Sequence, residues 1–323
     1  MTNNSQFIIS KDDAGSRLDV FLATHTDISR SQMKKKILAG QVLVNRMKAS
    51  VHQFLKESDT IQITQPKLRG TKDEIKNQTN ALEPKIIFED KDFLVIDKPS
   101  GMLVHPTQKH EENTIVDWLI KIHPEIKNVG EPKYRQGIIH RLDRDVSGIM
   151  LIAKTPAGFH HLKTQFKGRK VLKKYIALVY GIPSRPLGKI EIPIGRNEEG
   201  KFVAHPRTEN IKLQDSDKHA ITLYTIQKPI KNYALLDVQI LTGRTHQIRA
   251  HLSAVGHPVV GDNEYGPKKP FLKKFSKKIK VITAPRIFLH SHRIGFYNID
   301  NEWVEFESTL PETLKNFLKT INQ

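Results

Sequence analysis

The sequence predicts an α+β protein in which a small α/β unit precedes a mixed, largely antiparallel sheet. Two observations predict this class. Short strand-like apolar runs far outnumber convincing helices in the second part of the chain, and they do not alternate regularly with helices as in a doubly wound fold. With 323 residues, 38% of them apolar, the chain is long enough for two domains with a sizeable core.

The N-terminal unit is predicted to begin with a helix over residues 16–23. Its apolar residues Leu18, Phe21 and Leu22 fall on one helical face, as they do in a helix that covers a core. Two strands are expected later in this unit, over residues 41–45 and 60–64.

A second helix is expected between them, over residues 29–39. Ser29 is its predicted N-cap and Gly40 its end. Met33 and Ile37 form its apolar stripe. Its basic side chains point away from that stripe and are candidates for phosphate contacts, namely Arg30, Lys34 and Lys35.

Composition changes sharply at residues 66–83, which are polar and show no apolar periodicity. Such a stretch is typical of a linker. We therefore expect a first domain over residues 1–66, a linker over 67–82 and a second domain over 83–323.

The second domain contains many strand-like runs and few helices. Strands are expected over residues 86–90, 93–97, 137–140, 148–153, 175–181, 220–226, 234–240 and 286–296. Helices are expected over residues 113–122, 157–167 and 245–255.

Charge is the most informative feature of the composition. The formal net charge is +18 and the pI is about 9.8, so the field of the protein concentrates polyanions, of which nucleic acid is the commonest in cytoplasm. Lysines and arginines gather in two acid-free runs, at residues 163–174 and 268–280, where they suit phosphate contacts. A generally basic, solubilising surface is the alternative interpretation.

Several classes of protein are disfavoured by the sequence. No apolar run approaches the roughly 18 residues of a membrane-spanning helix, and the first residues do not resemble a leader peptide, so we expect a cytoplasmic protein without a membrane partner. The absence of cysteine excludes disulfides, a thiolate nucleophile and cysteine-based zinc sites.

A first candidate motif is IIHRLDRDVSG at residues 138–148, which sets Asp143 between Arg141 and Arg144. A carboxylate on a loop ringed by fixed positive charge stays ionised at neutral pH, and it can attack an electrophilic carbon or take a proton. We expect Gly148 to permit the tight turn that leads into the next strand. The simpler interpretation is half of a surface ion pair.

A second motif, TGRTHQIRAH, occupies residues 242–251. Thr245 is expected to cap a helix on which His246 and Arg249 share a face. An arginine there can hold a carboxylate of another loop in fixed geometry, because its planar guanidinium donates in a fork. Arg244 is expected to contact phosphate; the alternative is a surface pair of arginines.

A third element is Lys174–Tyr175, where a strand begins. A tyrosine in such a place usually packs in a core. Metal binding is not predicted: His246 and His251 lie five residues apart and His290 and His292 share a strand face, but no third ligand follows at a matching spacing. The chain also lacks dinucleotide-binding and Walker glycine loops, so no cofactor is expected.

These motifs together resemble those of the RluA-type family of RNA pseudouridine synthases, most closely its D-type branch, which is named for the large ribosomal subunit. The resemblance implies the pseudouridine synthase fold, with Asp143 as the catalytic aspartate and Arg249 as its paired arginine. It implies that Tyr175 stacks on the target base and that Arg141 occupies the space of the extruded base. Val146 stands where the family usually has threonine.

The resemblance extends to other parts of the chain. The loop Lys98–Gly101, followed by Val104–Pro106, matches an early family loop with an architectural role. Residues 14–64 resemble the S4 RNA-binding domain, with Arg46 and Glu57–Ser58 in place of the usual turn residues. RNA contacts are thus expected from Arg141, Arg144, Lys174, Arg244, His246, Arg30, Lys34 and Lys35.

The resemblance implies a cofactor-free isomerase that converts uridines of structured RNA, expected to be large-subunit ribosomal RNA, into pseudouridine. We expect it to act as a monomer. Two other functions stay open. A nucleic-acid N-glycosidase would release free uracil and leave an abasic site. A non-catalytic RNA-binding or ribosome assembly factor would need only the S4-like unit and the charge.

Overall fold

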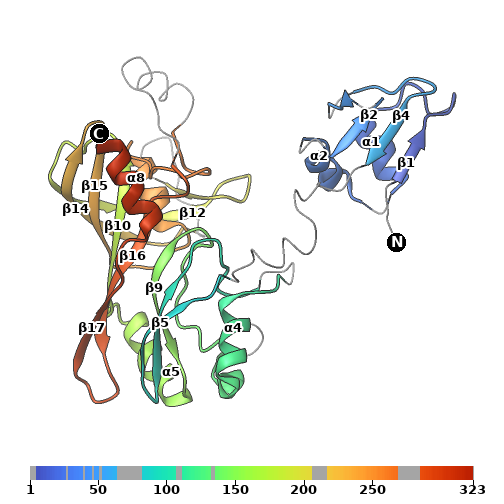
Figure 1. Ribbon diagram of the computed structural model, residues 1–323. Coiled ribbons are helices and arrows are strands. Elements are labelled where there is room, and N and C mark those ends of the chain that lie inside the picture. Colours follow the sequence, from blue (N-terminus) through green and yellow to red (C-terminus); the bar gives the residue numbers. More distant parts are fainter. Residues whose placement is uncertain are drawn as a thin grey trace. The chain divides into compact units, whose positions relative to one another are not determined.

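Figure 1 shows the computed structural model of the chain, which divides into two compact units, Met1–Asn80 and Ala81–Gln323. The structure describes residues 5–26, 28–38, 41–45, 47–50, 53–63, 82–106, 111–131, 135–205, 217–267 and 284–322. Gly40, Arg46, nearly all of the predicted linker 67–82 and the lysine-rich run at 268–280 lie outside these ranges, as does the side chain of Lys35.

The first unit packs two helices on a small antiparallel sheet. The strand order is β1-β4-β2-β3. The bounds are β1 Ser5–Ile8, α1 Leu18–Thr24, α2 Arg30–Leu38, β2 Val42–Val44, β3 Met47–Lys48 and β4 Thr60–Ile63. Both predicted helices and both predicted strands are therefore confirmed, and β1 and β3 are additions.

The apolar faces predicted for this unit are confirmed as well. Leu18 and Leu22 of α1 are buried together with Met33 and Ile37 of α2. Ser29 receives a hydrogen bond from the backbone N–H of Gln32, so it acts as the predicted N-cap of α2.

An ion cluster joins the two helices of the first unit. Asp19 of α1 is buried and accepts hydrogen bonds from Arg17 and from Arg30 of α2, the latter at 2.9 Å. Burial opposes ionisation of Asp19, but the two arginines outweigh it and lower its pKa. Arg30 therefore stabilises the pairing of α1 with α2, while Lys34 is exposed.

The second unit is built on one large mixed sheet, which confirms the predicted fold class. In its described part the sheet has nine strands, ordered β11-β14-β15-β10-β16-β9-β6-β5 with β17 beside β16. Among these strands only β9 and β16 run parallel to each other. Their bounds are β5 Lys85–Glu89, β6 Phe93–Lys98, β9 Ser147–Ala153, β10 Leu172–Tyr180, β11 Leu187–Glu191, β14 Ile221–Ile230, β15 Tyr233–Ile240, β16 Leu289–Tyr297 and β17 Trp303–Glu307.

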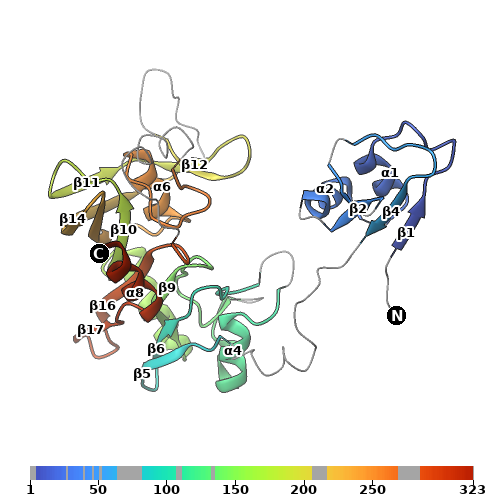
Figure 2. The ribbon, with the colours of Figure 1, turned by 45° about the horizontal axis from the view of Figure 1, so that its top comes forward.

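Helices and two small hairpins surround this sheet. They are α4 Ile115–Ile122, the 3-10 helix η1 Pro124–Asn128, α5 Pro156–Lys167, α6 Gln247–Ala254, α8 Glu312–Asn322, β7 Gly130–Glu131 with β8 Arg135–Gln136, and β12 Ile194–Arg196 with β13 Phe202–Ala204. Helix α6 lies beside the β12–β13 hairpin (Figure 2). No helix in the described ranges is long and apolar enough to cross a membrane.

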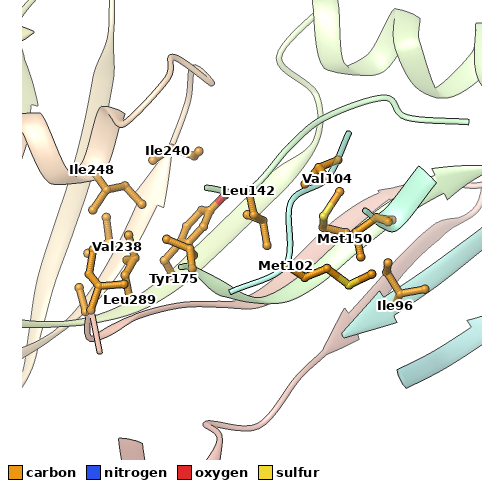
Figure 3. Close-up of a cluster of buried hydrophobic side chains, with 14 of the residues drawn as sticks. Ile96, Met102, Val104, Leu142, Met150, Tyr175, Val238, Ile240, Ile248 and Leu289 are labelled. Atoms are coloured by element: carbon orange, nitrogen blue, oxygen red, sulfur yellow. The ribbon is translucent and has the colours of Figure 1, made fainter. Parts of the chain in front are cut away.

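The largest apolar cluster forms where the middle of the sheet meets the loop that follows residue 140. In Figure 3, Leu142 of that loop lies between Tyr175 on one side and Met102, Val104 and Met150 on the other. All five residues are at most 7% exposed. The loop is thus anchored in the core by its own apolar residue.

Two details of the prediction are wrong. Residues 137–140 do not form a strand; Ile138 makes only an isolated bridge to Ile152 of β9. Gly148 does not make a turn but lies within β9, with a φ of +117°. A Cβ atom there would lie 2.1 Å from the carbonyl oxygen of Ser291.

We expect Gly148→Ala to lower the free energy of unfolding of the second unit by about 3 kcal/mol, because the added carbon meets the backbone of β16 and the φ is strained. Urea denaturation followed by tryptophan fluorescence measures this directly, since the two tryptophans, Trp118 and Trp303, both lie in the second unit. Gly256→Ala is the control, because Gly256 has a φ of +84° but no neighbour within 4 Å. Equal losses for the two variants would contradict the close approach of β9 and β16.

Candidate active site

Asp143 lies in a tight turn on the loop that leads into β9. The carbonyl oxygen of Asp143 accepts a hydrogen bond from the N–H of Val146 at 3.2 Å. Leu142 and Val146 are both buried in the core, so the two residues fix the ends of the turn. The Asp143 side chain is 18% exposed. Val146 occupies the position at which the family that the motifs resemble usually has threonine. It contributes apolar packing there instead of a hydroxyl.

A buried lysine supports this loop on one side. Lys98 at the end of β6 donates three hydrogen bonds, to the carbonyl oxygens of Pro99, Met102 and Arg144, at 2.8 to 2.9 Å. Burial lowers the pKa of Lys98 to about 7, although the charges of nearby aspartates oppose the shift. The architectural role implied for the loop that begins at Lys98 has its physical basis in these bonds.

Arg144 belongs to the same support. Its Nε donates to the carbonyl oxygen of Gly101 at 3.0 Å, and Arg144 does not line the cavity described below. The structure therefore places the Arg144 side chain at the contact between two loops.

A second support comes from β16 and the segment before it. Arg286 donates to the Ser147 hydroxyl at 2.7 Å and to the carbonyl oxygen of Asp145 at 3.2 Å. His290 is fully buried, and its ring nitrogens lie 2.9 Å from the Ser147 hydroxyl and 3.2 Å from the carbonyl oxygen of Ser308. Burial lowers the pKa of His290 to about 4, so this histidine is neutral at physiological pH.

Arg249 of α6 connects three carboxylates. Its Nη1 donates to Asp143 at 3.0 Å, its Nε and Nη2 form a two-pronged contact with Asp262 at 2.7 and 3.0 Å, and Nη2 also contacts Glu264 at 3.1 Å. Burial opposes the charged form of Arg249, but the hydrogen bonds and charges of Asp262 and Asp143 outweigh it and raise the pKa. The predicted pairing of Arg249 with Asp143 is thus present in the structure.

The partners Asp262 and Glu264 were not predicted from the sequence. Asp262 is buried, and it accepts hydrogen bonds from the backbone N–H groups of Glu264 and Tyr265 at 2.9 and 3.0 Å. Burial raises the pKa of Asp262, but Arg249 and the two N–H donors outweigh it, so the net shift is downward. The sequence does carry one signal for these two residues. In GDNEY, Asp262 and Glu264 form a pair of acidic residues shortly after two valines, within a strongly basic chain.

His246 borders Asp143 but does not belong to the helix. It is the N-cap of α6 with a φ of +56°, so the predicted cap at Thr245 and start of the helix are wrong. The side chain of Gln247 closes this turn instead, because its Oε1 accepts hydrogen bonds from the Thr242 hydroxyl and from the Arg244 N–H. The His246 ring lies 3.9 Å from Asp143 through Nε2.

Tyr265 packs beneath this group. Its hydroxyl lies 3.0 Å from Nδ1 of His246 and donates to the carbonyl oxygen of Phe202. The guanidinium of Arg249 lies 4.8 Å from the centre of the Tyr265 ring, within the range of a cation–π contact. Tyr265 therefore limits the freedom of both Arg249 and His246.

Tyr175 of β10 is only 6% exposed and packs in the large apolar cluster (Figure 3). Burial raises the pKa of its hydroxyl, a hydrogen bond with Ser291 opposes the rise, and the charge of Asp143 adds to it. The hydroxyl therefore carries its proton at neutral pH. The predicted packing of Tyr175 in the core is confirmed, and Tyr175 also lines the cavity.

A cavity of about 650 Å³ brings most of the predicted residues together. Its lining includes six of them, namely Asp143, Tyr175, Arg249, Arg141, Arg244 and His246. Another part of the lining is basic and consists of Lys163, Lys167, Arg169 and Lys173. The sequence predicts these residues only as members of a basic run that suits phosphate contacts. The arrangement exposes one carboxylate, held by an arginine, to a cavity whose charged lining residues are otherwise all lysines and arginines.

Lys174 is not among the lining residues. Side chains alternate along a strand, and Lys174 faces away from Tyr175 and pairs with Asp237 at 3.3 Å. Its neighbour Lys173 shares the face of Tyr175 and lines the cavity instead. In the described residues, no group of three or more His, Asp or Glu side chains is arranged to hold a metal ion.

Comparison with known proteins gives one consistent family. The family model described as RNA pseudouridylate synthase matches residues 92–254. An uncharacterized RNA pseudouridine synthase of Aquifex aeolicus is 34% identical to this chain, over 93% of the chain and 92% of that protein. A protein of Zymomonas mobilis named ribosomal large subunit pseudouridine synthase D is 31% identical, over 98% and 97% respectively.

A solved structure agrees with these matches. Human RNA pseudouridylate synthase domain containing 4 superimposes with a TM-score of 0.54 at 26% identity, covering 73% of this chain and 92% of that one. The matched family segment contains Asp143, Tyr175 and Arg249. From the family match and the relatives that span nearly its whole length, this chain belongs to the RNA pseudouridine synthase family, whose members are isomerases that act on RNA.

Proposed function

We propose that this protein isomerises one or more uridines of large-subunit ribosomal RNA to pseudouridine and that Asp143 performs the first chemical step. The observation that supports the proposal most strongly is the hydrogen bond from Arg249 to Asp143 at the wall of a basic cavity. Two motifs about a hundred residues apart meet in this contact. Two relatives that match nearly the full chain are named ribosomal large subunit pseudouridine synthase D.

The proposed reaction needs one carboxylate close to the sugar of the target uridine. Uracil is detached from C1′, rotated and rejoined through C5, so the bond from N1 to C1′ breaks and one from C5 to C1′ forms. C5 loses its proton and N1 gains one, so the overall change is an isomerisation. Asp143 either attacks C1′ or removes the 2′ proton; both routes need an ionised, fixed carboxylate. The fork of Arg249 supplies the fixation, because Asp262 holds its other two donor atoms.

The cavity also offers groups that suit an extruded nucleotide. Arg141 is exposed at the lining and, among the described residues, pairs with no acid, so it is free to take the place of the base in the RNA. Tyr175 presents an apolar ring to the cavity, which suits contact with the uracil face. Arg244 and His246 also line the cavity and suit contacts with the sugar and phosphate.

For the first unit we propose the role of an S4 RNA-binding domain. Its fold places α1 and α2 on one small sheet, and α2 carries Arg30 and Lys34 on its exposed surface. The proposed division is an S4-like domain at residues 1–66, a linker at 67–82 and the catalytic domain at 83–323. The protein is further proposed to act as a monomer on ribosomal RNA in the cytoplasm.

Asp143→Asn is expected to abolish isomerisation while RNA affinity stays nearly unchanged, because the change removes the charge and keeps the size. The assay uses unmodified large-subunit RNA transcript and detects pseudouridine as carbodiimide-dependent stops of reverse transcription. Asp145→Asn, an exposed aspartate of the same loop outside the cavity, is the matched control and should retain activity. More than about a tenth of wild-type turnover in Asp143→Asn contradicts the assignment, and free uracil from the wild type would indicate a glycosidase.

Arg249→Lys should lower the single-turnover rate by at least about a hundredfold although it keeps the charge, because an ammonium group cannot hold Asp143 and Asp262 at once in planar geometry. Arg293→Lys is the control; Arg293 pairs with Glu305 on the surface of the sheet, outside the cavity. Near-normal rates in Arg249→Lys would show that the clamp does not orient the reacting carboxylate.

A chain that begins at Ala81 should retain Asp143-dependent activity at saturating RNA but need more RNA to reach it. Each lost phosphate contact flattens the slope of log affinity against log salt by roughly 0.7 on single strands, so the slope should fall together with the affinity. The full chain measured side by side is the reference. An unchanged affinity and slope, or a folded but inactive protein, would show that the two units do not divide binding and chemistry in this way.

A further inference from the structure

One lysine of the cavity has no structural explanation in the fold. Lys173 is the second residue of β10 and only 8% exposed, and it shares a strand face with Tyr175 two residues later. Residues so spaced on a strand lie about 7 Å apart, so Lys173 lies close to the proposed position of the target base.

The surroundings of Lys173 are apolar or cationic. Its Nζ lies 5.6 Å from the centre of the Phe166 ring, and the nearby charge that acts on it is that of Arg169. Burial, and then Arg169, lower the pKa of Lys173 to about 8. His140, which stacks on Phe166 at 4.9 Å, is neutral because burial and Lys173 lower its pKa to about 3. Within the described ranges, no carboxylate forms an ion pair with Lys173.

Comparison with Lys98 shows which contacts the described residues do not provide for Lys173. Lys98 is also buried, and its Nζ donates to three carbonyl oxygens of the loops that it holds together. For Lys173 the described residues provide a ring face but no oxygen acceptor. A buried ammonium group is costly unless an anion or several acceptors compensate it, and an anionic ligand in the cavity would supply them.

We propose that Lys173 binds a phosphate group of the RNA strand directly beside the target uridine, with Lys167 and Arg169 as the exposed rim of the same phosphate site. The proposal rests on the proposed function in so far as it takes RNA as the ligand. A phosphate supplies the missing charge and acceptor oxygens at once. It also fixes the nucleotide next to Tyr175 while the base enters the cavity, so Lys173 is a binding residue and Asp143 keeps the chemistry.

The test measures binding of the full chain to an unmodified large-subunit ribosomal RNA transcript at several salt concentrations. Lys173→Met keeps the apolar contact with Phe166 and removes the charge. It should weaken binding about tenfold, as expected for one charge-assisted hydrogen bond, and flatten the log-log salt slope by roughly 0.7. Lys173→Arg should restore most of the slope. Lys319→Met, on an exposed position of α8 outside the cavity, should match the wild type.

Three outcomes overturn the proposal: a folded Lys173→Met protein with wild-type affinity and slope, an equal loss in Lys319→Met, or a larger loss in Lys174→Met, whose side chain lies on the opposite strand face. If Lys173→Met does not fold, Arg169→Gln at the exposed rim gives the answer. It should flatten the slope, and an unchanged slope excludes the site.

A kinetic arm separates this proposal from the proposed function. In single turnovers Lys173→Met should raise the half-saturating RNA concentration about tenfold and change the rate at saturation by less than about threefold, whereas Asp143→Asn has no rate at saturation. If the wild type binds the ribosomal transcript but does not modify it, the ribosomal substrate is wrong. In that case the salt dependence of binding alone tests the phosphate site, because this measurement does not require turnover.

Discussion

Arg249 forms four hydrogen bonds to three carboxylates, and the geometry of the cavity depends on them. They join α6 to the turn of Asp143 and to the segment of Asp262 and Glu264. Removing a partner from such a buried network leaves uncompensated charge, which typically costs about 3–5 kcal/mol. Asp262 is the more buried of the two aspartates, so it fixes Arg249 in place. The remaining donor of the fork is then aimed at Asp143, the one carboxylate of the pair that faces the cavity.

The turn of Asp143 is rigid because the groups around the reacting side chain already have partners. Lys98 holds the carbonyl oxygen of Arg144 on one side, and Arg286 holds Ser147 and Asp145 on the other. These bonds come from segments far apart in the sequence, and the apolar cluster of Figure 3 closes the turn from below. Catalysis by a fixed carboxylate benefits from such preorganisation, because misplacement by about 1 Å costs a large part of the rate.

The main features of this arrangement could be predicted from the sequence, and the omissions have physical causes. The fold class and both helices of the first unit follow from apolar periodicity, whereas the pairing of Arg249 with Asp143 is implied by the family resemblance of two dense motifs. Lys173 and Lys174 differ only by the face of a strand, and the cluster of basic residues does not show which of the two faces a cavity. The contact of Asp262 with Arg249 is not predictable from the sequence, because an acidic residue after a glycine carries no periodic signal. The start of α6 was misplaced because the Gln247 side chain, and not Thr245, closes the turn before it.

The central claim is that this cavity makes pseudouridine in large-subunit ribosomal RNA. It is tested most directly by mapping pseudouridines in ribosomal RNA from cells with and without this gene, by primer extension after carbodiimide treatment. Our account predicts that one or more carbodiimide-dependent stops in large-subunit RNA disappear without the gene and return when the wild-type gene is restored. An identical set of stops in both kinds of cell would contradict it.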